Sequence, residues 1–174
     1  MSIIGMSQSP RSPFGGRLLA AGVVGVALIW AQVGMAQSAG PFAKFAGNWR
    51  GSGQVVGADG NQERITCRAR YTVEQNGAAL SQSLVCASAS YRVDINSFIV
   101  ADGRSVQGHW QETTRQAQGE LTGQVSDGDF EGGVAGPGFT AQISLKAMGR
   151  KQAISIKPQG GDVSGVNIVL SRES

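Results

Sequence analysis

The segment 65–88 constrains the fold most, because its pattern predicts a β-hairpin that sets both cysteines of the chain opposite each other. Asn76-Gly77 lies at its centre, and this dipeptide readily adopts the positive φ angles of a type I′ turn. Pairing residues outward from these two sets Cys67 against Cys86. The same register sets apolar residues against each other: Val73 against Leu80 and Ala69 against Leu84.

Cys67 and Cys86 are the two cysteines of the sequence. In an exported chain such a pair most often forms a disulfide. The alternative is a pair of free, redox-active thiols, but neither cysteine belongs to a Cys-x-x-Cys motif or lies at a helix start. The sequence therefore predicts a structural disulfide between Cys67 and Cys86. Counting from a two-residue turn makes this a hydrogen-bonded pair of the ladder.

The first 36 residues have the composition of a signal peptide. Arg11 and Arg17 are their charged residues, and an apolar run follows at 18–33. Gly34 and Ala36 then place small residues at the −3 and −1 positions of a cleavage site. The run is shorter than the roughly 20 residues of a membrane span, although an uncleaved signal anchor is the alternative. This pattern predicts a periplasmic or secreted protein.

The remaining 138 residues are enough for one domain and too few for two of ordinary size. We expect a signal peptide at 1–36, a linker with a short helical turn at 37–46, and a single β-barrel domain at 47–174. The whole chain has 15 basic and 12 acidic residues, and loss of Arg11 and Arg17 leaves 13 against 12. Such a balance indicates no nucleic-acid partner. We expect no stable membrane span after signal removal, and the oligomeric state stays open.

Alternation of apolar and polar residues continues along the chain and predicts about ten strands joined by short turns. Asp102-Gly103, Asp127-Gly128 and Gly149-Arg150 are expected as two-residue turns. A polar loop is expected at 113–119, and an odd-numbered loop is expected between the first two strands. The resulting pairs are Val55–Ile65, Ile99–Val106, Ile95–Trp110, Val125–Phe130, Leu121–Val134, Leu145–Ile154 and Ile143–Ile156.

Consecutive hairpins in a long sheet favour closure, because closure removes exposed edge strands. The predicted fold class is therefore all-β, an antiparallel up-and-down β-barrel of about 8–10 strands. The alternative is a two-sheet β-sandwich.

The first strand carries Gly47-Asn48-Trp49, which resembles the Gly-x-Trp motif that opens lipocalins and other calycin barrels. The resemblance rests on Gly47 and Trp49. It implies a barrel in which the tryptophan packs across a closed end. It also implies that the other end admits a small apolar ligand.

The inward positions combine large and small residues, which can either fill a tapered barrel or leave an apolar cavity. We expect five aromatic side chains to line a ligand-binding lumen: Trp49, Tyr71, Trp110, Phe130 and Phe139. The first functional hypothesis is an exported barrel that binds a small hydrophobic molecule. The second is a structural or protein-interaction component of the cell envelope with a filled core.

Other candidate sites have ordinary explanations. His109, the one histidine, is expected on the outer face, where solvation is commoner than haem ligation or proton transfer. Asp127, Asp129 and Glu131 share one face, as calcium ligands can, but turn chemistry explains them as well. A stripe of outward arginines, Arg64, Arg68 and Arg70 with Arg50 beside it, could meet an anionic surface or simply be solvated. One histidine leaves no Ser-His-Asp triad, so we expect no enzyme, cofactor or metal site.

Overall fold

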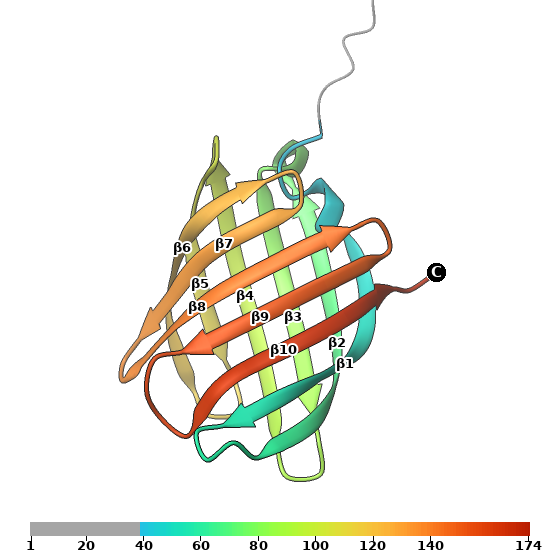
Figure 1. The fold of residues 1–174 in the computed structure, drawn as a ribbon. Coiled ribbons are helices and arrows are strands. Elements are labelled where there is room, and N and C mark those ends of the chain that lie inside the picture. The colour runs from blue at the N-terminus through green and yellow to red at the C-terminus, as the bar shows by residue number, and fades with distance from the viewer. Residues whose placement is uncertain (1–38) are drawn as a thin grey trace, which may run out of the picture. The chain divides into compact units, whose positions relative to one another are not determined.

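The computed structural model describes residues 39–174. The predicted signal peptide lies outside the described residues. Ten strands and two short 3₁₀ turns make up the described chain (Figure 1). Their bounds are η1 Ala43–Phe45, β1 Gly47–Gly57, β2 Gln62–Glu74, η2 Gln75–Gly77, β3 Ala79–Ala87, β4 Arg92–Asp102, β5 Ser105–Glu112, β6 Ala117–Ser126, β7 Asp129–Gly136, β8 Phe139–Met148, β9 Lys151–Pro158 and β10 Val163–Arg172.

Each strand pairs antiparallel with the next one in sequence, and β1 also pairs with β10. The sheet is therefore a closed up-and-down barrel, which confirms the predicted fold class and excludes the two-sheet sandwich. Within residues 39–174 every strand has two neighbours, so closure leaves no edge strand.

Three of the predicted turns have the expected register. The pairs Cys67–Cys86, Val125–Phe130 and Leu145–Ile154 are all observed. Odd-even sorting is thereby preserved around the barrel, and the apolar set forms one interior core.

Two predicted registers are wrong by two residues, and one loop is shorter than expected. The β4–β5 turn consists of Gly103-Arg104, so Trp110 faces Ser97 instead of Ile95 and Val106 faces Ala101 instead of Ile99. The odd-numbered loop after β1 is present, but it consists of residues 57–61, between the Val56–Gln62 pair, and sets Ile65 against Gly53 instead of Val55. The polar loop before β6 ends at Gln116. A shift of two residues keeps every side chain on its face, so these errors do not alter the core.

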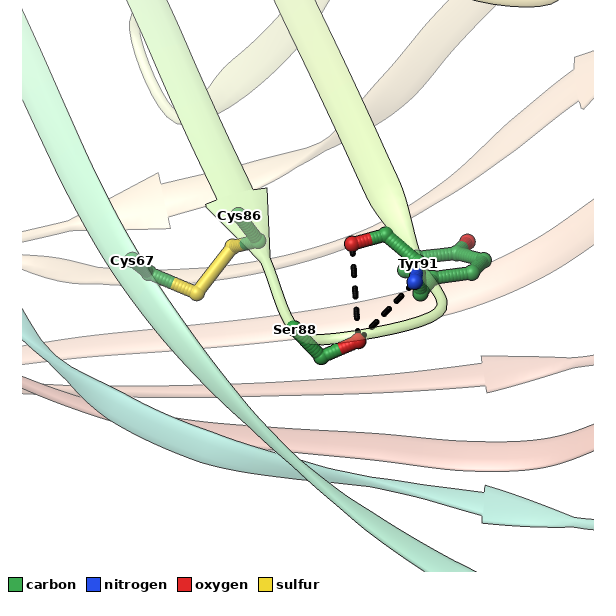
Figure 2. The surroundings of a disulfide bond; sticks show 4 residues. All are labelled: Cys67, Cys86, Ser88 and Tyr91. Carbon is green, nitrogen blue, oxygen red and sulfur yellow. Dashed lines mark hydrogen bonds between the residues drawn. A yellow bond between two sulfur atoms is a disulfide. The ribbon is translucent and has the colours of Figure 1, made fainter.

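The disulfide between Cys67 and Cys86 joins β2 to β3 (Figure 2), as predicted. The ladder phase, however, differs from the expectation. The two Cα atoms lie 4.1 Å apart, which matches the close spacing of a non-hydrogen-bonded pair. The reason is the connection at Asn76-Gly77, which is a wider loop flanked by the Glu74–Ala79 pair. The loop has four residues, 75–78, instead of the two at 76–77, and has the same centre. The pairs of residues therefore stay the same, but each hydrogen-bonded pair becomes a non-hydrogen-bonded pair and the reverse.

Gly51 explains how β1 closes the barrel against β10. A Cβ atom at this position would lie 2.0 Å from the carbonyl oxygen of Val169, which no side chain can tolerate. The absence of a side chain therefore allows the backbone of β10 to approach that of β1.

The segment before β1 covers one end of the barrel, which we call the closed end (Figure 1). Its backbone is held there by hydrogen bonds from Gly40 and Phe42 to the η2 turn, of 2.9 and 3.0 Å. The rings of Phe42 and Phe45 are fully buried. In residues 39–174, no helix is long and apolar enough to cross a membrane.

Candidate ligand-binding site

The barrel interior contains a cavity of about 1340 Å³, which we call the lumen. Ligand pockets for small molecules usually measure about 300–1,000 Å³, so the interior is not filled by its own side chains. Phe42, Phe45 and Tyr71 form the floor at the closed end. Residues of four loops at the other end, which we call the mouth, complete the lining: Tyr91, Arg115, Pro137 and Gly160.

Between the floor and the mouth the walls are mainly aliphatic. Inward positions of β3, β4, β8 and β9 contribute branched side chains, because alternation sends every second residue of each strand into the barrel. The aliphatic lining includes Leu80, Leu84, Ile95, Ile99, Leu121, Val134, Ile143, Leu145, Ile154, Ile156 and Ile168. Such a surface favours an apolar ligand, since binding removes apolar area from water on both partners.

Four of the five aromatic residues predicted for the lumen line it. Tyr71 lies at the floor, Trp110 and Phe130 lie in the walls, and Phe139 lies near the mouth. Phe139 is 40% exposed, and its ring meets that of Trp110 edge-on at 5.8 Å between centroids.

Trp49 is the exception among the five, because it does not line the cavity. It is fully buried at the closed end, where its Nε1 donates a 2.8 Å hydrogen bond to the carbonyl oxygen of Phe45. The guanidinium of Arg172 lies 4.5 Å from its ring centroid. Phe42 and Phe45 of the 39–46 segment line the lumen at this end instead, and the sequence pattern alone could not place them.

Polar lumen residues were missed by the sequence reasoning. Gln82 and Ser97 occupy inward positions of β3 and β4, and Ser97 Oγ donates a 3.1 Å hydrogen bond to Gln82 Oε1. Both residues lie at inward positions of the apolar-polar alternation in their strands. That alternation could therefore have predicted them from the sequence. The prediction for the lumen was instead limited to aromatic residues.

At the floor, the Tyr71 hydroxyl donates a 3.0 Å hydrogen bond to Oε1 of Gln152, which is fully buried. Burial raises the pKa of Tyr71 far above its ordinary value. The phenol is therefore a protonated donor at neutral pH.

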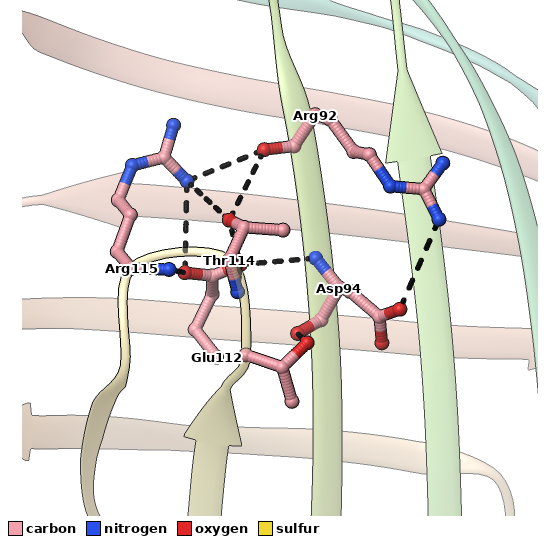
Figure 3. Close-up of polar contacts among 6 residues, drawn as sticks. Arg92, Asp94, Glu112, Thr114 and Arg115 are labelled. Carbon is pink, nitrogen blue, oxygen red and sulfur yellow. Dashed lines mark hydrogen bonds and ion pairs between the residues drawn. The ribbon is translucent and has the colours of Figure 1, made fainter.

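A carboxylate organises one loop of the mouth (Figure 3). Glu112, at the end of β5, is 5% exposed and points inward. Its oxygens accept backbone hydrogen bonds from Asp94 at 3.1 Å, Thr114 at 3.0 Å and Arg115 at 2.7 Å. The guanidinium of Arg115 lies 3.7 Å from the same carboxylate and 4.8 Å from the ring centroid of Tyr91.

Burial raises the pKa of Glu112, but its hydrogen bonds from Thr114, Asp94 and Arg115 together outweigh burial and lower the pKa to about 2. A carboxyl group with a lowered pKa stabilises the fold above its unfolded-state value of 4.5, and this contribution disappears as the pH falls toward 2. The ionised form of Glu112 thus holds the 113–116 loop in place.

We predict that Glu112→Gln lowers the free energy of unfolding at pH 7 and that the difference from the unsubstituted protein shrinks as the pH falls from 4.5 to 2. The measurement is urea unfolding followed by circular dichroism at several pH values. Glu120→Gln, on the outer face of β6, is the control, because an exposed substitution should leave the curve unchanged. A constant difference between Glu112→Gln and the unsubstituted protein at all pH values would contradict the assignment.

The structure also places the remaining candidates. His109 is exposed on the outer face of β5, with its ring 5.9 Å from that of Phe98, and does not reach the lumen. Asp127 pairs with Lys44 at 2.7 Å, and Asp129 pairs with Lys146 at 3.3 Å. Within the described part of the chain, no three His, Cys, Asp or Glu residues form a group that could hold a metal ion.

The outward arginines do form a stripe on β1 and β2, with Arg50 directly opposite Arg68 in the ladder. Two of these arginines interact with polar neighbours. Arg50 pairs with Glu173 at 3.0 Å, and Arg70 donates a 3.1 Å hydrogen bond to Asn48.

No family model matches the chain, and no curated protein sequence matches it either. Solved structures with the same fold are nevertheless known. Rv2717c from M. tuberculosis superposes with a TM-score of 0.61 at 10% identity, over 76% of this chain and 94% of that one. The S-type phycobiliprotein lyase CPES from Guillardia theta gives a TM-score of 0.52 at 16% identity, over 76% and 90% of the two chains.

A protein of unknown function from the DUF3598 family of Nostoc punctiforme gives a TM-score of 0.53 at 14% identity. That match covers 75% of this chain and 48% of the longer protein. At these identities the likeness concerns the fold alone. Residues 39–174 form a ten-stranded antiparallel barrel, the fold that the resemblance at Gly47 and Trp49 implies.

Proposed function

We propose that this protein binds a small hydrophobic molecule in its lumen. The observation that carries the proposal is the cavity of about 1340 Å³ with aliphatic walls, a closed floor and a mouth formed by loops. The side chains that line an apolar cavity of this size lack van der Waals contacts on one side, and a bound apolar molecule would supply them. The envelope component with a filled core is less well supported, because the core is not filled.

We further propose that the protein acts after export and that binding, not catalysis, is its role. The buried disulfide supports an oxidising compartment. The phycobiliprotein lyase among the structural neighbours bears an enzyme's name, but the likeness reaches no further than the fold.

Titration with N-phenyl-1-naphthylamine, a neutral dye that fluoresces in apolar surroundings, tests the proposal. We expect saturable enhancement at one dye per protein. Ile143→Gln introduces an amide into the aliphatic wall and should weaken dye binding by about tenfold, since burying an amide without a partner costs about 1–3 kcal/mol. Thr140→Gln is the matched control on the exposed face of the same strand and should bind the dye normally.

Native mass spectrometry of the purified protein provides a second test. A reproducible additional mass that organic extraction removes would support a bound ligand. A clean apo mass together with no dye enhancement would overturn the proposal and favour the interaction protein.

A further inference from the structure

A row of hydrogen-bonding side chains runs across four neighbouring strands of the lumen wall. It consists of Tyr71, Gln82, Ser97 and Trp110, one residue from each of β2, β3, β4 and β5. The ladder pairs each with the next: Tyr71 with Gln82, Gln82 with Ser97, and Ser97 with Trp110. All four line the lumen. We call these four residues the polar band, and the wall around them is mainly apolar.

Two donors of the band have acceptors in the structure. The hydroxyl of Ser97 donates to Gln82 Oε1, and the hydroxyl of Tyr71 donates to an oxygen outside the band. The amide nitrogen of Gln82 brings two further donors, and an indole N–H can only donate. Within residues 39–174, Nε1 of Trp110 is buried and has no hydrogen-bond partner. A buried donor without a partner is costly, so the band lacks one acceptor.

Trp110 lies in the lumen wall. Its side chain is 8% exposed and lines the lumen between the aliphatic positions of β4 and β6. Opposite it in the ladder lie Ser97 and Gly119. A Cβ atom at Gly119 would lie 1.8 Å from the carbonyl oxygen of Ala135, so the backbone packs closely on this side of the indole. The neighbouring Phe139 packs edge-on against the ring and fixes its plane.

We infer that the lumen selects apolar molecules that carry a neutral hydrogen-bond acceptor, such as a ketone or ester carbonyl, and that Trp110 Nε1 donates to it. The inference rests on the proposed function and adds the class of ligand. No charged side chain belongs to the band. Among the described residues that line the lumen, Arg115 is the one cation, and its guanidinium already faces the carboxylate of Glu112. The acceptor is therefore a neutral oxygen and not a carboxylate.

The test compares 2-acetylnaphthalene with 2-isopropylnaphthalene, which have similar shapes and differ in the carbonyl oxygen. Both are used to displace N-phenyl-1-naphthylamine from the full protein and from Trp110→Phe. Phenylalanine keeps an aromatic ring and removes the N–H group. We expect the substitution to weaken ketone binding by about three- to tenfold, as the loss of one hydrogen bond implies, and to change hydrocarbon binding by less than about twofold.

Trp49→Phe is the matched control, because it removes an indole N–H that lies outside the lumen. It should leave the ketone-to-hydrocarbon ratio unchanged. Indole ¹H–¹⁵N spectra of the unsubstituted protein give a readout that does not depend on a variant that folds. The Trp110 resonance should move downfield with saturating ketone and much less with the hydrocarbon.

The outcomes separate the two proposals. Equal effects of Trp110→Phe on both probes, or a Trp110 resonance that the ketone leaves in place, would overturn the inference while dye binding upholds the proposed function. No binding of dye, ketone or hydrocarbon would overturn both. A selective loss of the ketone with a shifted resonance supports both.

Discussion

Replacing Trp49 by alanine is expected to lower the free energy of unfolding by about 3–5 kcal/mol, the usual cost of removing a large buried aromatic side chain. Trp49 is fully buried, and three interactions depend on its ring. The indole donates to the Phe45 carbonyl oxygen, packs in the core and lies under the Arg172 guanidinium. Arg172 in turn donates to the Lys44 carbonyl oxygen at 2.6 Å, so the closed end should loosen as a unit.

Urea unfolding followed by circular dichroism measures this loss. Trp49→Phe keeps a ring and removes only the N–H group, so it should cost less, about 1–3 kcal/mol. Val169→Ala on β10 serves as the surface control, because Val169 is 56% exposed and should contribute within about 0.5 kcal/mol. A loss below about 1 kcal/mol for Trp49→Ala would show that the closed end does not depend on this residue.

Removing the disulfide with Cys67→Ala and Cys86→Ala together should cost about 3 kcal/mol. The bridge closes a loop with a sequence separation of 19, and the chain-entropy model assigns about that value to such a loop. The melting temperature of the double variant should fall by roughly 10 °C. Differential scanning calorimetry with and without reducing agent provides the measurement.

Reducing agent should act only on the protein that has the bridge, so the double alanine variant is also the control for solvent effects. Both cysteines are buried, at 0% and 1% exposure, and reduction should therefore be slow until the barrel opens. Titration of two free thiols in freshly purified, unreduced protein would rule out the bridge.

The strand order and the interior set could be read from the sequence because both depend on local rules. A two-residue turn such as Asp127-Gly128 specifies its own register, and alternation then assigns faces from strand to strand. The Asp102-Gly103 prediction failed because a neighbouring pair, Gly103-Arg104, can form the turn equally well. The resulting shift of two residues preserved the faces, which is why a local error left the fold unchanged.

The binding site could be predicted only in part. Tyr71, Trp110, Phe130 and Phe139 were expected inward and do line the lumen, whereas Trp49 belongs to the closed end. Gln82 and Ser97 were overlooked although their phase is inward. The role of Glu112 in its loop could not be predicted from the sequence. The hydrogen bonds that hold its carboxylate come from Asp94, Thr114 and Arg115, which belong to two different segments.

The sequence by itself determined which side chains of each strand face inward, which strands are neighbours and which cysteines meet. These properties follow from a period of two and from turns that act over a few residues. Only the tertiary structure decided that the interior stays open and that one end is closed by the segment before β1. Volume and closure depend on how all ten strands curve around a common axis and on which distant backbone atoms approach each other, as at Gly51 and Val169. No local sequence pattern specifies this combined effect of all ten strands.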